Sequence, residues 1–332
     1  MMIDYKHLVC VRCITYNHAP FIQDALNGFC TQNTTFPFVC VIIDDASIDG
    51  EQFIINSYLT EHFDLEGNNA WSLDTDEYKL IYARHKENKN CFFAVYLLKY
   101  NHYQVRKSKL PYFSEWDNRT KYIAICEGDD YWIDSCKIQK QVDFMETHPD
   151  YGMCYCNYRD YNEETSSYKS SETGSIKGIS DLLLKNSIAS LTTLFRSDLY
   201  YKYIEEIAPR KRGWKMSDYP RWIWMELESA IHYIDDVVAV YRTLPESASH
   251  SKDYKKRLAF IESSRDIRLF FAEKYSLGEG VKNMIDDVYW RERSRVLKGK
   301  DNRAYFRALK NIRNKSFREE LKAFFSFFLQ FC

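Results

Sequence analysis

Three carboxylates surround one glycine in the stretch Tyr122–Trp132, which reads Y-I-A-I-C-E-G-D-D-Y-W. The acids are Glu127, Asp129 and Asp130, and they directly follow the apolar run Tyr122–Cys126. An apolar run of this length bounded by Gly and Asp is typical of a buried strand. Adjacent acids at a strand end repel each other unless a positive group lies between them, and a hard divalent cation carrying phosphate oxygens supplies one. The alternative is an ordinary turn with solvated acids.

Two further polar clusters follow predicted strands nearer the N-terminus. The run His7–Ile14 precedes T-Y-N-H-A-P, which begins at Thr15, and the run Val39–Ile43 precedes D-D-A-S-I-D-G, which begins at Asp44. Apolar residues between the two runs recur at helical spacing, so the two strands are predicted to be parallel with a right-handed crossover. Open α/β sheets bind ligands at the C-terminal ends of parallel strands, so we expect all three clusters to converge on one crevice.

The remaining pattern predicts an α/β fold, with a mixed, mostly parallel central sheet flanked by helices over residues 1–252 and a helical, basic region over 253–332. Further strands are expected at 79–83, 151–157, 191–195 and 231–241. Helices are expected at 21–30, 51–59, 92–104 and 217–230, around Ile138, Val142 and Met145, and from about 253 onwards. The polar segment 163–178 is expected to be a loop.

Composition excludes several classes of protein. The formal net charge of −1 over 332 residues gives no nucleic-acid signature. Most of the ten cysteines lie inside apolar runs, as buried reduced thiols do, and the Cys10–Cys13 pair lacks the second pair of a zinc site. No signal-peptide pattern and no apolar run of about 18 residues is present, so a cytoplasmic protein is expected.

The C-terminal region is strongly basic. Between Tyr289 and Lys322 there are twelve Lys or Arg and four Asp or Glu, and the aromatic run Ala323–Phe331 follows. Such a segment can lie on an anionic membrane surface, here the inner face of the membrane. Alternatively, it can pack on its own domain or on a second copy of the chain in a homodimer. Both interpretations stay open from the sequence.

The spaced motifs together resemble glycosyltransferase family 2, the inverting nucleotide-sugar transferases with the Rossmann-like GT-A fold. The resemblance covers about residues 7–251. Its matching stretches are I-T-Y-N-H-A-P-F-I at 14–22, V-I-I-D-D-A-S-I-D-G at 41–50, the acidic segment at 122–145, S-D-Y-P-R-W at 217–222, and I-H-Y-I-D-D-V-V-A-V-Y-R with S-A-S-H-S at 231–251.

The resemblance implies a role for each strand-end cluster. Donor-binding residues would be Thr15, Tyr16, Asn17, Asp44, Asp45, Ser47 and Asp129. Mg²⁺ or Mn²⁺ would be held by Asp130 first, with Asp129 and His250 as further ligands, and Arg242 and Glu127 would contact the diphosphate or the acceptor. The sequence departs from the family in having E-G-D-D where members carry D-x-D, N-K-N-C-F at 88–92, and a basic insert at 100–121.

The resemblance also places a general base on Asp218, at the start of a predicted helix. A base must be ionised to accept a proton, and a helix N-terminus favours the carboxylate form. The alternative role for Asp218 is a simple helix cap.

The expected function is metal-dependent transfer of a sugar, with inversion, from a nucleoside diphosphate, in first place a UDP-sugar, to a hydroxyl. The acceptor would be a saccharide or a lipid-linked saccharide in surface polysaccharide or glycolipid assembly. One alternative is a sugar-phosphate nucleotidyltransferase, although T-Y-N-H-A-P lacks the Gly-rich, basic loop of that class. Another is a non-catalytic nucleotide-sugar-binding module. A prenyl-diphosphate enzyme is disfavoured because its acids must lie on helices.

Overall fold

The computed structural model describes residues 5–170, 174–244, 253–316 and 319–320. The chain forms two compact units. The first comprises residues 1–175, 188–203 and 228–243, and the second comprises 176–187, 204–227 and 244–332. This division differs from the expected boundary at 252, because two segments that precede that boundary cluster with the C-terminal helices instead.

The first unit is built on one sheet, to which all twelve described strands belong. The path of the sheet is β3-β5-β6-β2-β1-β7-β11-β9-β12-β8, with β4 paired to β5 and β10 paired to β9. The strands are β1 (Val9–Thr15), β2 (Phe38–Asp44), β3 (Phe63–Asp64), β4 (Trp71–Asp74), β5 (Tyr78–His85), β6 (Cys91–Leu98), β7 (Tyr122–Ile125), β8 (Tyr131–Trp132), β9 (Tyr151–Asn162), β10 (Ser167–Ser170), β11 (Leu194–Arg196) and β12 (Ala230–Thr243).

The three strands that precede the polar clusters lie side by side and run parallel, as predicted. In the register of the sheet Thr15 lies opposite Asp44, and Arg12 lies opposite Ile125. The C-terminal ends of β1, β2 and β7 therefore meet at one edge of the sheet. The long β12 also runs parallel to β9, whereas β11 pairs antiparallel with β7 and β9. The sheet is thus mixed and flanked by helices, which confirms the predicted fold class.

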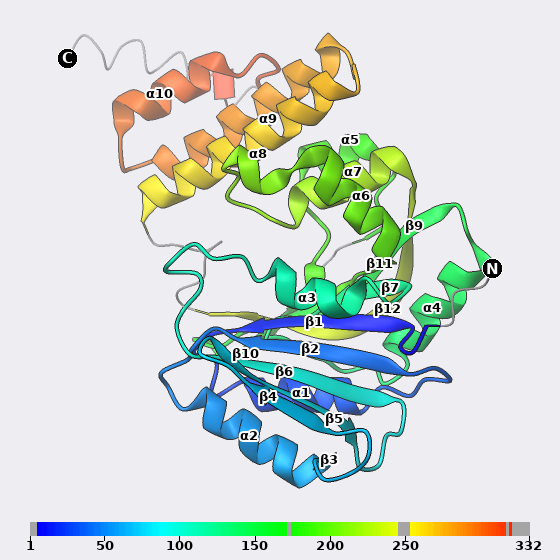
Figure 1. The fold of residues 1–332 in the computed structure, drawn as a ribbon. Coiled ribbons are helices and arrows are strands. Elements are labelled where there is room, and N and C mark those ends of the chain that lie inside the picture. The colour runs from blue at the N-terminus through cyan, green and yellow to red at the C-terminus, as the bar shows by residue number, and fades with distance from the viewer. Residues whose placement is uncertain (1–4, 171–173, 245–252, 317–318, 321–332) are drawn as a thin grey trace. The chain divides into compact units, whose positions relative to one another are not determined.

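Alternation along the strands divides the core of the first unit between the two faces of the sheet. Val9, Val11 and Cys13 pack with α1 (Ile22–Cys30), α2 (Glu51–His62) and α4 (Lys137–Thr147). Cys10 points to the opposite face, where α3 (Leu110–Asp117) contributes Tyr112 and Phe113. Figure 1 shows α1 and α2 on one side of β1 and β2, with α3 on the other. Because β2 is covered on both faces, all seven of its residues are buried.

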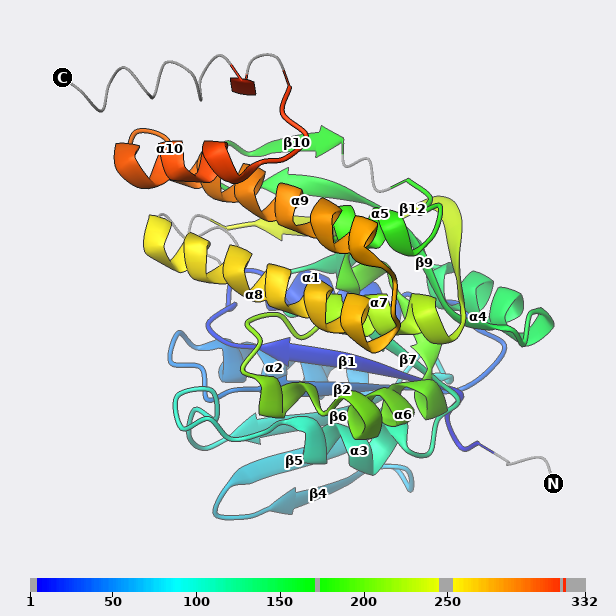
Figure 2. The same cartoon turned by 90° about the horizontal axis from the view of Figure 1, so that it is seen from above.

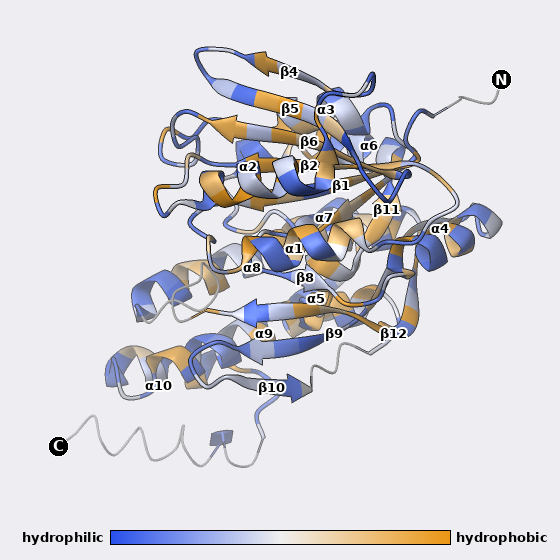
Figure 3. Cartoon of the chain, turned by 90° about the horizontal axis from the view of Figure 1, so that it is seen from below, coloured by the Kyte–Doolittle hydropathy of each residue, from blue (hydrophilic) through white to orange (hydrophobic). Residues whose placement is uncertain are grey.

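The helix predicted at 92–104 is wrong, because residues 91–98 form β6. All eight residues of β6 are buried, since the strand lies between β2 and β5 with both of its faces covered. A run that is apolar on both faces carries no period that separates strand from helix. The loop predicted at 163–178 is also wrong in part, because residues 167–170 form β10. Figure 3 shows that β10 is polar, whereas β6 is apolar.

The second unit is helical. It contains α5 (Ile179–Leu184), the C-terminal end of α6 (Ser197–Ile207), most of α7 (Tyr219–Glu228), and all of α8 (Tyr254–Lys274), α9 (Glu279–Leu297) and α10 (Asn302–Asn311). Helix α9 packs against both α8 and α10, and Figure 2 shows these three helices side by side. The helical prediction from residue 253 is therefore confirmed for the described part of this region. Within the described residues, no helix combines the length and apolar character needed to cross a membrane.

Candidate functional site

The loops after β1 and β2 are fastened together by reciprocal hydrogen bonds. The backbone amide of Asn17 donates to Ser47 Oγ at 2.9 Å, and the amide of Ile48 donates to Asn17 Oδ1 at 2.9 Å. Asn17 has φ of 57°, a left-handed conformation that asparagine tolerates better than most residues. Two of the predicted donor-binding residues, Asn17 and Ser47, thus lie on one rim, and a third, half-buried Tyr16, precedes Asn17 in the chain.

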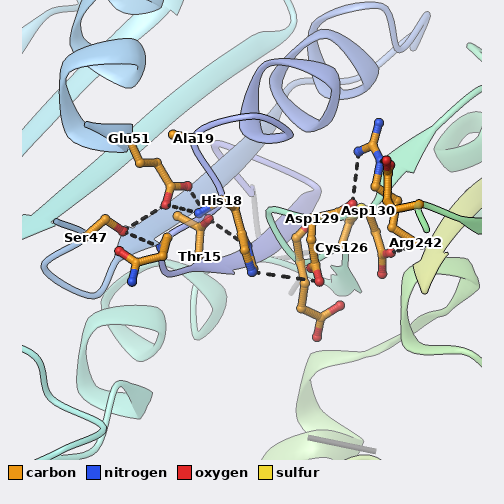
Figure 4. A network of polar contacts seen from close by, with 12 residues as sticks. Thr15, His18, Ala19, Ser47, Glu51, Cys126, Asp129, Asp130 and Arg242 are labelled. Carbon is orange, nitrogen blue, oxygen red and sulfur yellow. Dashed lines mark hydrogen bonds and ion pairs between the residues drawn. The ribbon is translucent and has the colours of Figure 1, made fainter. Parts of the chain in front are cut away.

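A buried carboxylate beneath this rim was not singled out from the sequence. Glu51, the first residue of α2, accepts hydrogen bonds from the Thr15 hydroxyl, from Ser47 Oγ at 2.8 Å and from the His18 amide at 2.9 Å (Figure 4). Burial raises the pKa of Glu51, and its three donors oppose that shift. The available signal was an acid in the first turn of the helix, four residues after Ser47, a pattern that also fits ordinary capping.

The two aspartates after β2 have different surroundings. Asp44 is fully buried, and its Oδ1 accepts from the Ser47 amide at 3.0 Å and from Gln52 Nε2 at 2.5 Å. Its Oδ2 is buried without a hydrogen-bond partner among the described residues. Burial raises the pKa of Asp44, chiefly by desolvating its carboxylate. A buried oxygen without a partner at this edge of the sheet suits a ligand that offers an N–H or O–H group.

The Asp45 carboxylate, by contrast, is hydrogen-bonded by donors of the protein itself. Its carboxylate accepts from the amides of His102 and Tyr103, at 2.8 and 3.1 Å, and from Lys109 Nζ at 2.7 Å. These three donors come from the basic insert at 100–121, which departs from the pattern of glycosyltransferase family 2. Asp45 therefore anchors that insert beside the end of β2, and its donor contact stays a prediction.

The acidic loop after β7 approaches β1 closely. The Gly128 amide donates to the Ile14 carbonyl at 3.1 Å, and a Cβ at residue 128 would overlap the Thr15 side chain. Glycine is therefore required for Asp129 to lie beside the rim. Asp129 has a side chain that is 23% exposed, and its Oδ2 lies 3.8 Å from His18 Nε2.

Asp130 points the other way. It is 3% exposed, and its Oδ1 accepts from the Arg242 amide at 2.8 Å. Burial raises its pKa well above the usual range, and the charges of Asp129 and Glu127 add to that shift. Glu127 is half-buried beside them. Asp129 is therefore the aspartate that faces outward, and Asp130, the expected first metal ligand, is the buried one.

Arg242 fastens this loop to the rest of the first unit. Its guanidinium donates to Glu163 at 2.8 Å, to the Asp129 carbonyl at 3.0 Å and to the Asp24 carboxylate. The guanidinium carbon also lies 5.0 and 4.6 Å from the ring centroids of Phe21 and Tyr131. Each nitrogen of the guanidinium donates one of these bonds and the side chain is 8% exposed, so Arg242 is suited to positioning the loop, and its diphosphate contact stays a prediction.

The acidic loop can bind a divalent cation through one carboxylate, with the other ligands coming from water and substrate. Among the described residues, no group of three or more His, Cys, Asp or Glu side chains is arranged to hold a metal ion. His250, predicted as a further ligand, lies outside the described residues. Mg²⁺ and Mn²⁺ sites that use one or two carboxylates take their other ligands from water and substrate phosphates. The outward carboxylate of Asp129 meets that requirement better than buried Asp130.

Asp218 belongs to the second unit and lies at the N-terminus of α7, as predicted. Its carbonyl accepts from the amides of Arg221 and Trp222, at 2.9 and 3.1 Å, and so opens the helix. Its carboxylate Oδ2 accepts from Asn186 Nδ2 at 3.3 Å. An acid at a helix N-terminus is stabilised in its ionised form. The assignment of Asp218 as a base stays a prediction.

Comparison with solved structures finds chains of similar fold. TarS of Staphylococcus aureus in complex with UDP-GlcNAc has a TM-score of 0.53 at 14% identity, over 91% of this chain and 79% of that chain. A mannosyltransferase of Pyrobaculum calidifontis in complex with GDP-Man and Mn²⁺ has a TM-score of 0.52 at 14% identity, over 99% and 82%. At these identities the likeness concerns the fold.

Sequence comparison finds relatives whose own function is not characterised. No family model matches the chain. Uncharacterised proteins of Mycobacterium tuberculosis and Mycobacterium bovis are 27% identical over 261 residues, which are 75% of this chain. The match spans only 62% of the length of those relatives, so they extend well beyond it.

Proposed function

We propose that the chain is an inverting glycosyltransferase of family 2 that uses a nucleoside-diphosphate sugar, in first place a UDP-sugar. The observation that carries the proposal is the meeting of three polar strand ends at one sheet edge, with an outward carboxylate on Asp129 and an orphaned buried oxygen on Asp44. The likeness to TarS, which was solved with UDP and UDP-GlcNAc, supports the choice of donor. The GDP-Man complex of the other neighbour makes GDP-mannose the second donor to test.

In the proposed site each residue of the rim has a definite task. Tyr16 offers a ring for stacking on the nucleotide base, and Asp44 Oδ2 accepts a hydrogen bond from the base or ribose. Asp129 would hold Mg²⁺ or Mn²⁺, which would supply positive charge to offset the negative charge on the leaving diphosphate. Asp130 and Arg242 keep the loop of Asp129 in place.

The proposed chemistry needs one proton acceptor. Asp218 takes the proton of the acceptor hydroxyl as that oxygen bonds to the anomeric carbon. The bond from the anomeric carbon to the diphosphate oxygen breaks, and its electron pair leaves with the nucleoside diphosphate. Attack on the side opposite the leaving group inverts the anomeric centre. The acceptor is proposed to be a saccharide or a lipid-linked saccharide.

Calorimetric titration tests the donor site of the unmodified protein. UDP is expected to bind with Mn²⁺ present and at least about tenfold more weakly after chelation, a difference of about 1.4 kcal/mol. Titrations with GDP and with CMP serve as matched nucleotide controls. Absence of UDP and GDP binding under all conditions would refute the proposal.

The alternative from a different class is a binding module that holds a nucleotide sugar without turning it over. Slow release of UDP from a panel of UDP-sugars, with water as acceptor, would favour the enzyme. Tight UDP-sugar binding without any release over hours would favour the module. A nucleotidyltransferase is disfavoured because the loop Thr15–Pro20 contains no glycine and no Lys or Arg.

A membrane contact through the basic C-terminal region is also proposed. On α10 the exposed cations Arg303, Arg307 and Lys310 recur at helical spacing, while Ala308 and Leu309 are buried. Each cation near an anionic surface contributes about 1 kcal/mol, so replacing all three by alanine is expected to weaken binding to phosphatidylserine vesicles by about 10²-fold at low salt. Cosedimentation measures this, with neutral phosphatidylcholine vesicles as control. Equal binding of the unmodified and triple-substituted proteins would contradict the proposal.

A further inference from the structure

The hydrogen bonds around Thr15 define which nitrogen of His18 carries a proton. The Thr15 hydroxyl has a single hydrogen, and it is donated to the buried Glu51 carboxylate. Thr15 Oγ also lies 3.2 Å from His18 Nδ1. Because the hydroxyl hydrogen is already used, the proton of this second bond must come from the imidazole. His18 therefore has Nδ1–H donating to Thr15.

The other ring nitrogen faces the acidic loop. His18 Nε2 lies 3.8 Å from Asp129 Oδ2, which is longer than a direct hydrogen bond. In the neutral ring with Nδ1–H, Nε2 carries a lone pair, so two acceptor atoms face each other across this gap (Figure 4). Both side chains are partly exposed, at 20% and 23%, so a ligand from solvent can reach the gap. Two facing acceptors are satisfied by a cation or by a water that donates both of its hydrogens, and next to a diphosphate the cation also offsets charge.

We propose that His18 Nε2 is a nitrogen ligand of the divalent cation held by Asp129. The inference rests on the proposed function, because it concerns the same cation. Thr15 and Glu51 are the positioning residues that fix the ring. A histidine ligand usually donates its second N–H to a carboxylate, a carbonyl or water, which sets its tautomer and orientation. Here the Thr15 hydroxyl relays that contact to Glu51, and the Glu51 carboxylate in turn holds the His18 backbone amide.

One consequence concerns the choice of metal. Mg²⁺ strongly prefers oxygen ligands, whereas a site with one imidazole and one carboxylate suits a transition metal better. The protein with UDP bound is therefore expected to take Mn²⁺ in preference to Mg²⁺. Replacing His18 should reduce that preference, whereas a change that merely loosened the fold would weaken both metals together.

The test is a pulsed paramagnetic resonance measurement on the full chain with Mn²⁺ and UDP. The unmodified protein is expected to show modulation from a directly bound ¹⁴N nucleus. In His18→Asn the side-chain amide can still donate to Thr15 in place of Nδ1–H, but Nε2 is gone. This variant is expected to lose the ¹⁴N modulation and to bind Mn²⁺ about 10- to 100-fold more weakly. His148→Asn, at an exposed histidine after α4, is the matched control and should leave both readouts unchanged.

Three outcomes separate this inference from the proposed function. If Mn²⁺ and UDP bind but no ¹⁴N modulation appears, the histidine ligand is refuted and the donor site stands. If the modulation survives His18→Asn and disappears in His250→Asn, the nitrogen belongs to His250 and the inference is again refuted. If neither Mn²⁺ nor UDP binds to the unmodified protein, the proposed function fails and this inference fails with it.

Discussion

Replacing Asp129 by alanine is expected to abolish metal-dependent nucleotide binding while leaving the fold intact. The Asp129 side chain is partly exposed, and its one ion pair with a described residue is the long one to His18, so its removal costs little stability. Loss of a carboxylate ligand should weaken Mn²⁺ binding in the presence of UDP by about 10²-fold or more, which is about 2.7 kcal/mol. Calorimetry with UDP and Mn²⁺, together with thermal unfolding, measures both effects.

Two control substitutions distinguish the metal-binding role proposed for Asp129 from the structural role of Asp130. Asp76→Ala removes an exposed carboxylate of the same unit and should change neither metal binding nor stability. Asp130→Ala should lower the unfolding temperature, because the Arg242 amide would lose its buried acceptor. If Asp130→Ala lost metal binding at unchanged stability while Asp129→Ala kept it, the order of ligands predicted from the sequence would be restored.

Asp218→Asn is expected to stop turnover without weakening the donor complex. Asparagine keeps the size of the side chain but cannot accept the proton of the acceptor hydroxyl. Removing a general base costs about 10²- to 10⁴-fold in rate. The release of UDP from a UDP-sugar, first with water and then with saccharide acceptors, gives the rate, and calorimetry with UDP gives the binding.

A matched substitution decides whether the effect is specific. Asp266→Asn changes an exposed carboxylate on α8 of the same unit and should leave the rate unchanged. Asp218→Glu, which restores a carboxylate at a shifted position, should recover part of the lost rate. Undiminished turnover by Asp218→Asn would reduce Asp218 to a helix cap held by Asn186.

The sequence alone determined the frame of this site. Short apolar runs that end in polar clusters at Thr15, Asp44 and Glu127 predicted parallel strands whose ends converge, and the register of β1, β2 and β7 confirms this. That inference succeeds because burial on both faces leaves a local signature in the sequence, and because the crossover between parallel strands has one preferred hand. The helical C-terminal region was readable for the same kind of reason, namely local periodicity.

Local patterns failed where a segment is apolar throughout. The run that forms β6 has no polar face to reveal its period, so only its place between β2 and β5 makes it a strand. The division into two compact units also depends on tertiary contacts. The segments 176–187 and 204–227 join the helical unit through contacts with distant residues, such as the hydrogen bond from Arg268 to Tyr219 at 2.8 Å.

The roles of adjacent acids were decided by tertiary structure. Two neighbouring aspartates are equivalent in a sequence motif, but the backbone amide of Arg242, 112 residues away, captures Asp130 and leaves Asp129 facing outward. Likewise, Lys109 of the insert donates a hydrogen bond to Asp45, while one oxygen of Asp44 has no partner among the described residues. The sequence could place carboxylates at the strand ends, because strand burial is a local property. Their directions depend on which distant donor reaches each one, and that is settled only when the chain has folded.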